Sequence, residues 1–502
     1  MRVAWRVLVA AGSGGLLWAA FPKLDLCWLA WVALAPFFGL YAASRPPRPG
    51  LTGWVFGLAF ATGTLHFVAI FGYLPVAALV LQQSVFYWVL GALLALAARR
   101  GAWARTFGFA ALWTAAEWAR SLGPLGHTIG ALGYSQQKPL VPVQCAALTG
   151  VFGVSFVVAL VNACLAAMIM HRRRGGREGL AAPVTMAALL LAACLGFGWW
   201  RLGGEEREAT GPSYRVGVVQ TEVKPGPPGT CGIFAADDFE QHIRATEAMP
   251  RGTDLVVWPE TVVTESVLGN RALRRPIEEA ARRTNAFVLA GSTEREGSRK
   301  YNSAVLFGPD GEVVGRYDKR HLVVFGEYVP LREQLAMIFE RYPVPTRDYA
   351  PGRYPPVLRA GRARLGMMIC FEALFPWAAR EARNLGANLL VVTTNDGWFL
   401  FTAGGYHSLI ACALRAVENN APMVRAAKTG VSCFIDTRGR IHSPTRLFEA
   451  ATLHRELRLA GARTLYDRIG DLLAVLCVAW AVWLVVATVA RRGKRRTEPL
   501  TG

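Results

Sequence analysis

The sequence contains few charged residues and no recognisable nucleotide or zinc-peptidase motif. Charged residues make up 18% of the 502 residues, whereas soluble domains usually carry about 25%. Together with a hydrophobic content of 53%, this shortage indicates that part of the chain lies in a lipid bilayer. The G-x-S-x-G, H-E-x-x-H and P-loop patterns are all missing, which argues against the enzyme classes that depend on them.

The cysteines form neither a disulfide framework nor a zinc site. The nine cysteines include no C-x-x-C pair, and their spacing matches no known metal-binding pattern. We therefore expect no metal and no cofactor. Because a free cysteine often behaves as a small buried hydrophobe, we interpret Cys231, Cys412 and Cys433 as structural thiols.

Long apolar segments and short basic runs alternate along the chain. Each apolar segment approaches the roughly 20 residues that a helix needs to cross a bilayer. Membrane-spanning helices are predicted at residues 5–21, 26–43, 51–73, 76–98, 104–122, 146–170, 180–200 and 470–490. The net charge of +20 could also suit nucleic acid. No basic and aromatic surface pattern accompanies it, so we expect no nucleic-acid partner.

The basic runs predict the topology. They begin the chain and follow the second, fourth, sixth and last predicted spans. These are alternate connections, and Lys and Arg accumulate on the cytoplasmic side. About eight spans with both termini in the cytoplasm are therefore predicted. This topology places the region between the last two spans in the periplasm of a bacterium.

That region has the pattern of a layered α/β domain. Strands are predicted at 214–220, 254–260, 286–292, 303–311, 364–370 and 388–396, and helices at 274–284, 376–386 and 407–420. An Asp-Gly pair within 308–319 predicts a hairpin. We expect a membrane domain over 1–203, a catalytic domain over 204–465, and a last span with a basic tail over 466–502.

Three reactive residues follow apolar strand segments. Glu260 closes "VVWPE", Lys319 lies in "YDKRHLVVFGEYVP", and Cys370 closes "GMMIC". A cysteine nucleophile needs a base or a nearby positive charge, and a lysine can stabilise the oxyanion formed at a carbonyl. The trio suits acyl transfer through a thioester. His321 or His407 could instead form a Cys-His pair. We favour structural roles for both histidines, because Glu260 already supplies a base.

These motifs, followed by "ICFE" and "TTNDGWF" in this order, resemble the nitrilase superfamily with its Glu-Lys-Cys triad. With the predicted spans, the whole chain resembles the apolipoprotein N-acyltransferases of the bacterial inner membrane. The resemblance implies a nitrilase-like αββα sandwich beside the helical membrane domain. It also implies a ping-pong reaction. A phospholipid, usually phosphatidylethanolamine, acylates the cysteine, and the thioester then acylates the α-amino group of a diacylglyceryl-cysteine on an apolipoprotein.

The resemblance assigns roles to individual residues. It makes Glu260 the general base, Lys319 the oxyanion stabiliser and Cys370 the nucleophile. Supporting roles are implied for Glu327, which orients Lys319 or assists proton transfer, for Glu372 beside the nucleophile, and for the backbone N–H of Phe371 in the oxyanion hole. We expect the protein to be a monomer that contacts membrane lipids.

The aromatic segment after "TTNDG" could serve the lipid substrate. We hypothesise that Trp398, Phe399 and Phe401 form a lid or an acyl-chain wall within 398–405; ordinary core packing is the alternative. The chain departs from the usual family pattern at Phe371, where tyrosine is common, at 400–407, and at Lys428, where asparagine is common. Residues 221–234 also lack the usual tryptophan.

Two other functions remain open on sequence alone. A membrane-anchored nitrilase-like amidase would use water as its second acceptor and release free acid. A transporter or lipoprotein-binding protein would carry polar residues within its spans. Glu117 and the loop 127–137 are the few candidates for such a path.

Overall fold

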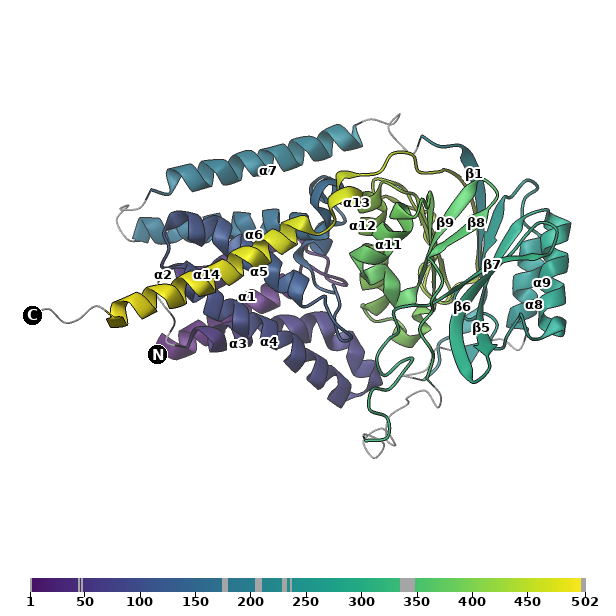
Figure 1. Cartoon of the computed structure of the whole chain (residues 1–502), viewed down its shortest axis with the longest axis horizontal. Helices are drawn as coiled ribbons and strands as arrows, with labels where there is room; N and C mark the ends of the chain where they lie inside the picture. The colour runs from purple at the N-terminus through teal and green to yellow at the C-terminus, as the bar shows by residue number, and fades with distance from the viewer. Residues whose placement is uncertain are drawn as a thin grey trace, which may run out of the picture. The chain divides into compact units, whose positions relative to one another are not determined.

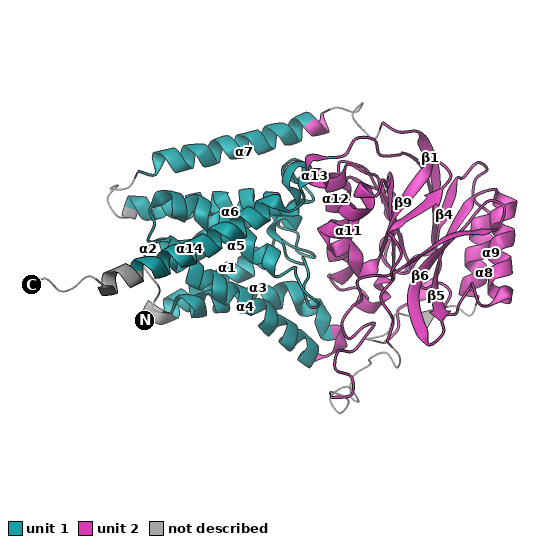
Figure 2. Cartoon of the chain, viewed as in Figure 1, with its two compact units in different colours: residues 1–69, 73–200, 469–502 teal, residues 70–72, 201–468 magenta. Residues whose placement is uncertain are grey.

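The chain divides into two compact units. The computed structural model describes residues 2–43, 46, 48–173, 179–203, 210–227, 233–234, 237–334 and 348–497. One unit comprises residues 1–69, 73–200 and 469–502, and the other comprises 70–72 and 201–468 (Figure 2). The first unit is therefore assembled from segments that flank the second in sequence. Cys231 lies outside the described residues.

The first unit is helical (Figure 1). Its elements are α1 (Arg2–Trp18), η1 (Cys27–Trp31), α2 (Ala35–Ala43), α3 (Pro49–Leu65), η2 (His66–Phe71), α4 (Tyr73–Ala97), the π-helical η3 (Ala104–Gly108), α5 (Phe109–Ala119), η4 (Leu132–Gln136), η5 (Pro142–Cys145), α6 (Ala146–Arg173), α7 (Ala181–Leu202) and α14 (Leu472–Thr497). Within the described residues, five helical segments are long and apolar enough to cross a membrane: Pro49–Phe71, Tyr73–Ala97, Pro142–Arg172, Ala181–Leu202 and Leu472–Arg491.

The predicted count of about eight spans is not confirmed. Helix α1 has 17 residues, and the apolar stretch Cys27–Ala43 is also short. The stretch predicted as 104–122 consists of the π-helical turn η3 followed by the 11 residues of α5. These segments are helical and apolar, but their lengths fall below those of the five long segments.

Small residues and aromatic rings hold the helical unit together. A Cβ added at Gly53 of α3 would lie 2.1 Å from the carbonyl oxygen of Tyr87 on α4, so only glycine permits this close helix approach. The Tyr87 ring centroid lies 5.5 Å from that of Phe56 and 5.7 Å from that of Trp113. The helices thus pack through close backbone contact and interlocking aromatic rings.

The second unit contains two six-stranded mixed sheets. The first has the order β14-β1-β4-β5-β6-β7 and the second the order β13-β12-β11-β10-β9-β8. The strands are β1 (Ser213–Gln220), β4 (Leu255–Val257), β5 (Phe287–Glu296), β6 (Arg299–Phe307), β7 (Val313–Asp318), β8 (Val357–Ala360), β9 (Ala363–Ile369), β10 (Leu389–Thr394), β11 (Met423–Ala427), β12 (Cys433–Ile435), β13 (Ile441–His442) and β14 (Ala451–Arg458); β2 (Val223–Lys224) and β3 (Ile233–Phe234) form a separate pair. The three central strands of each sheet, β1-β4-β5 and β9-β10-β11, are parallel.

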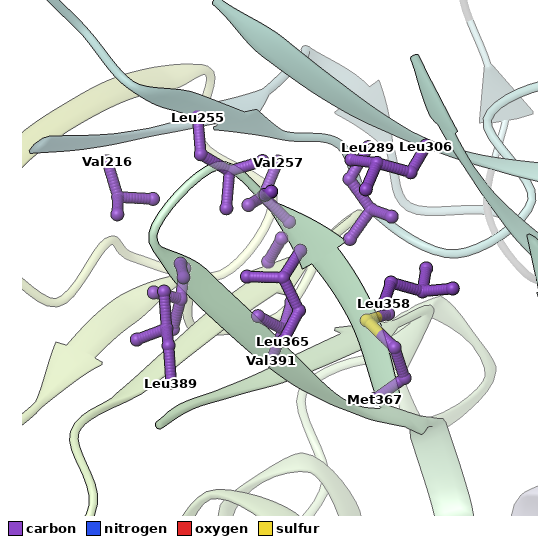
Figure 3. Packing of buried hydrophobic residues seen from close by; sticks show 14 of the residues in the cluster. Val216, Leu255, Val257, Leu289, Leu306, Leu358, Leu365, Met367, Leu389 and Val391 are labelled. Atoms are coloured by element: carbon purple, nitrogen blue, oxygen red, sulfur yellow. The ribbon is translucent and has the colours of Figure 1, made fainter. Parts of the chain in front are cut away.

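The two sheets face each other across an apolar core (Figure 3). Side chains such as Val216, Val257 and Leu289 from the first sheet meet Leu365 and Val391 from the second. All five are fully buried. This alternation of apolar side chains on the inner faces is what joins two sheets into a sandwich.

Helices cover the outer faces of both sheets (Figure 1). Helices α8 (Asp238–Glu247) and α9 (Arg271–Thr284) lie against the first sheet, where Ile277 and Trp258 share one buried cluster. Helices α11 (Pro376–Asn384) and α12 (Gly404–Asn419) cover the second sheet. The short α13 (Leu465–Ile469) follows β14. The predicted αββα layering is confirmed.

Candidate active site

The three residues predicted to be reactive each follow a strand, two of them in the first sheet and one in the second. Glu260 comes soon after β4, Lys319 directly follows β7, and Cys370 directly follows β9. The backbone N–H of Asn395, which directly follows β10, donates to Glu260 Oε2 at 2.7 Å. Ends of strands from both sheets therefore meet at one place, as ligand sites in layered α/β folds often do.

Lys319 lies between two glutamates. Its Nζ is 3.0 Å from Glu327 Oε1 and 3.6 Å from Glu260 Oε1. The lysine side chain is 2% exposed. Its positive charge is therefore stabilised by these two carboxylates and not by water. Glu327 is itself fixed, because the backbone N–H of Val323 donates to its Oε2 at 2.8 Å.

Asn302 on β6 joins the same two carboxylates. Its Nδ2 donates to Glu260 Oε1 at 2.7 Å and to Glu327 Oε1 at 2.9 Å. The backbone carbonyl of Asn302 also accepts a hydrogen bond from the Lys319 N–H at 2.8 Å. The sequence prediction missed Asn302. The available signal was an amide just before the apolar end of a strand, in "YNSAVLF".

Cys370 occupies a strained turn between β9 and the 3-10 helix η7 (Cys370–Leu374). Its φ is +53°, in the left-handed region that residues other than glycine rarely adopt. Strain of this kind is often retained at reactive sites. The side chain is half-buried, and it interacts with Lys319, Glu260 and Thr394.

Burial keeps the cysteine protonated at rest. Desolvation raises the pKa of Cys370 to about 12, with a further contribution from the charge of Glu260, while the charge of Lys319 and the polar side chain of Thr394 oppose the shift. A thiol with this pKa needs a base before it can attack. Burial, reinforced by Glu327, also raises the pKa of Glu260 against the opposing charge of Lys319. A carboxylate with raised proton affinity is a better base.

Lys319 remains charged despite its burial. Desolvation alone lowers its pKa, but the charges of Glu327 and Glu260 outweigh that effect and raise the pKa above its ordinary value. A lysine held cationic in a dry site can stabilise negative charge that develops on a nearby oxygen.

Glu372 lies at the turn that carries Cys370. Its carboxylate accepts hydrogen bonds from the Tyr317 hydroxyl at 2.9 Å, the Ile369 N–H at 2.8 Å, and the Arg320 N–H at 2.8 Å. The N–H of His321 adds a fourth at 3.0 Å. Glu372 therefore connects the turn at Cys370 to the segment that follows Lys319.

Phe371 packs into an aromatic cluster beside Cys370. Its ring centroid lies 5.9 Å from that of His321 and 5.2 Å from that of Phe375. The backbone N–H of Phe371 lies in the first turn of η7, where backbone donors have no partner within the helix. Burial, together with the charge of Lys319, lowers the pKa of His321, which favours a neutral imidazole.

The predicted lipid-contacting aromatics follow the strand end at Asn395. Trp398 and Phe399 lie in the 3-10 helix η8 (Asp396–Phe399). Trp398 is 41% exposed and Phe401 is 52% exposed, while the Phe401 ring lies 5.0 Å from that of Phe448. Trp398 and Phe401 are therefore surface side chains of this unit and not core residues.

A buried ion pair supports the same strand ends. Arg425 Nη2 lies 2.7 Å from Asp396 Oδ2, and Arg425 Nη1 donates to the Val431 carbonyl at 2.6 Å. The Thr394 hydroxyl donates to Asp396 Oδ1 at 3.0 Å. The prediction gave Asp396 and Arg425 no role, although Asp396 follows a buried strand just as Cys370 does. No group of three metal-ligating side chains occurs among the residues that the structure describes.

Comparison with known proteins identifies the family. An apolipoprotein N-acyltransferase from Geobacter metallireducens is 36% identical over 511 residues, covering 97% of this chain and 95% of the relative. The chain belongs to the apolipoprotein N-acyltransferase family. The N-terminal domain of apolipoprotein N-acyltransferases matches residues 13–164, and the carbon-nitrogen hydrolase family matches residues 234–467.

Further similarities cover either the whole chain or its second unit. An apolipoprotein N-acyltransferase from Bradyrhizobium diazoefficiens is 30% identical over 529 residues, with 97% of this chain and 96% of the relative covered. An amidase from Nesterenkonia sp. AN1 aligns with 52% of this chain and 98% of its own, at 22% identity and a TM-score of 0.38. The membership of this chain in the apolipoprotein N-acyltransferase family rests on the full-length relatives.

Proposed function

We propose that the protein transfers an acyl chain from a phospholipid, through a thioester on Cys370, to the N-terminal amine of a diacylglyceryl-cysteine on an apolipoprotein. The observation that carries the proposal is that the half-buried Cys370 interacts with the buried Lys319 and Glu260, which lie 3.6 Å apart. Family membership supplies the substrate classes. Phosphatidylethanolamine is the donor that we propose.

In the first half-reaction, Glu260 removes the proton from the Cys370 thiol. The thiolate attacks the ester carbonyl of the phospholipid, and the oxyanion that forms is stabilised by Lys319 and by the Phe371 N–H. When the tetrahedral intermediate collapses, the lysophospholipid leaves as an alkoxide and takes the proton from Glu260. Cys370 is left as a thioester.

In the second half-reaction, the α-amine of the acceptor attacks the thioester carbonyl. Glu260 accepts the ammonium proton of the tetrahedral intermediate, and the same donors stabilise the second oxyanion. Collapse breaks the C–S bond, and the Cys370 thiolate takes the proton back from Glu260. The product is an amide on the lipoprotein, and the enzyme returns to its resting state.

Glu327 and Asn302 support the base and the lysine. Both contact Glu260 or Lys319 without needing to touch the acyl group. We assign Glu372 a positioning role at the nucleophile turn, because its carboxylate accepts hydrogen bonds from Tyr317 and from the backbone. We propose that Trp398, Phe399 and Phe401 contact the acyl chain.

We further propose a multi-pass inner-membrane protein, with the catalytic unit in the periplasm and both termini in the cytoplasm. The five long apolar segments and the family support the membrane location. The basic runs that alternate between spans support the orientation. Cysteine labelling of the connections in intact cells tests this topology.

Intact mass of the purified protein after incubation with phosphatidylethanolamine tests the reaction, with Cys370→Ala in parallel. We expect an acyl-sized, hydroxylamine-labile increment on the wild type alone. A diacylglyceryl-cysteine peptide should then discharge it with formation of an amide. Release of free fatty acid without amide would instead support the amidase function. Absence of any adduct on folded protein would contradict the thioester.

A further inference from the structure

Lys428 is a buried lysine, outside the Glu260–Lys319–Cys370 cluster, that contacts the backbone next to Glu260. It directly follows β11, and its backbone N–H donates to the Thr394 carbonyl at 2.9 Å. Its Nζ lies 3.1 Å from the Thr261 carbonyl oxygen and 3.3 Å from Asp238 Oδ2. The side chain is 2% exposed, and an ammonium so buried is held by partners of this kind.

The contacted backbone is strained and closely packed. Thr261, which follows Glu260, has a φ of +47°, a conformation that is costly for a β-branched residue. A Cβ added at Gly291 of β5 would lie only 2.0 Å from the Pro259 carbonyl oxygen. The turn from Pro259 to Thr261 is therefore pressed against β5 on one side and held by Lys428 at its carbonyl.

Asp238 anchors Lys428 to the first sheet. The Thr221 hydroxyl, just beyond β1, hydrogen-bonds to Asp238 Oδ1. His242 Nδ1 lies 2.9 Å from the Asp238 carbonyl oxygen. Lys428 itself follows a strand of the second sheet. Its side chain therefore connects the end of that sheet to Asp238 and to the Thr261 carbonyl, next to Glu260.

We propose that Lys428 is a positioning residue that fixes the left-handed turn at Thr261 and so directs the Glu260 carboxylate toward Lys319 and Cys370. The inference rests on the proposed function of Glu260 as the base. Lys428 acts on the rate of cysteine activation through Glu260, without a contact to the phospholipid or to the acceptor. Its removal therefore slows acylation while leaving donor affinity in place.

The test uses the full-length protein with Lys428→Met, which keeps the length of the side chain and removes the charge and the donors. We expect the rate of Cys370 acylation by phosphatidylethanolamine to fall at least about tenfold, with the KM for the donor unchanged. An acylation rate equal to that of the wild type per folded molecule would overturn the proposal.

The double variant Asp238→Asn/Lys428→Met distinguishes an effect of Lys428 on the position of Glu260 from an effect on the stability of the fold. It removes both members of the ion pair, so no unpaired buried charge remains and the melting temperature should recover relative to Lys428→Met. The Thr261 carbonyl still lacks its donor, so acylation should stay slow. Acylation that recovers together with the melting temperature would assign Lys428 a structural role only.

Alkylation of Cys370 by iodoacetamide makes the test independent of the acyl donor. We expect Lys428→Met to move the pH midpoint of alkylation in the same direction as Glu260→Gln, measured at Cys370 by peptide mass spectrometry. A wild-type midpoint in Lys428→Met, beside a shifted midpoint in Glu260→Gln, would overturn the positioning role. If the wild type alkylates normally but is not acylated by the lipid, it is the proposed function that fails.

Discussion

The side-chain amide of Asn302 donates to Glu260 at 2.7 Å. The second hydrogen of the same amide nitrogen is donated to Glu327 at 2.9 Å, so one neutral side chain bridges the two carboxylates that flank Lys319. The arrangement keeps both glutamates in place without a second buried cation.

Replacing Asn302 should therefore lower the rate of Cys370 acylation, and loss of folding stability alone should not account for this fall. For Asn302→Ala we expect the rate of Cys370 acylation to fall by about tenfold to a hundredfold, because Glu260 loses a bond that orients it. Time-resolved intact mass measures that rate. The matched control is Asn270→Ala, which removes the N-cap of α9. The control should cost about 1 kcal/mol of stability and leave acylation as in the wild type; equal rates for the two variants would contradict the role of Asn302.

The pH dependence of acylation should report the protonation of Glu260. Acylation requires the carboxylate form, so the rate falls as the pH falls through the pKa of Glu260. Burial raises that pKa above the ordinary value of 4.5, so the acid limb should lie at a higher pH than for an exposed glutamate. The hydrogen bond from Asn302 lowers the pKa, so Asn302→Ala should move the limb to still higher pH. A limb that moves to lower pH would exclude Glu260 as its origin.

Glu372 should matter for the stability of the nucleophile turn. Glu372→Gln places an amide group, itself a donor, among N–H and O–H donors, and one of them loses its acceptor. We expect a loss of about 1–3 kcal/mol in the free energy of unfolding, measured by thermal or denaturant unfolding in detergent. Tyr317→Phe removes a single hydroxyl from the same carboxylate and should cost less. A larger effect from Tyr317→Phe would show that the backbone donors are not the main partners.

Gly291 should not tolerate even a methyl group. In Gly291→Ala the new Cβ would meet the Pro259 carbonyl and the Glu260 backbone, so the Glu260 turn must shift and acylation should be lost or nearly lost. Gly196→Ala in α7 is the matched control, because nothing lies within 4 Å of its added Cβ. Acylation by Gly291→Ala at the wild-type rate would show that the turn can relax without cost.

Trp398 tests the proposed acyl-chain contact. If its exposed ring forms part of a lid or wall for the acyl chain, Trp398→Ala should raise the KM for phosphatidylethanolamine several-fold, through loss of apolar contact area. Trp199→Ala, which removes an exposed tryptophan from α7, should leave the KM unchanged. Unchanged donor kinetics in Trp398→Ala would remove the idea of a lid.

The sequence was sufficient to place Glu260 and Cys370 just after strands. Glu260 and Cys370 each follow a short apolar strand, and the hairpin with Asp310-Gly311 appears between β6 and β7 as expected. The contribution of Asn302 depends on strand register, because Ser303 pairs with Asp318 and so brings Asn302 beside Lys319. Register is set by long-range pairing and not by residues near Asn302 in sequence.

Strand β14 was not predicted, because its sequence is polar. Strand β14, "ATLHRELR", alternates exposed polar side chains with half-buried or buried ones and forms the edge of the first sheet. Charged side chains are usual on edge strands, where they discourage pairing with other chains. The five long apolar helices were predicted from their apolar length, but the count of about eight spans is not confirmed, because segments such as α2 and α5 are shorter than the sequence predicted.

The discontinuous first unit has a consequence for how the protein is made. Helix α14 packs against α4, α5 and α6, and Arg100 at the end of the α4 region donates to Thr488 at 3.1 Å. These partners leave the ribosome long before α14 exists. The helices before the second unit are therefore synthesised without this partner, and α14 can complete their packing only after the whole second unit has been made.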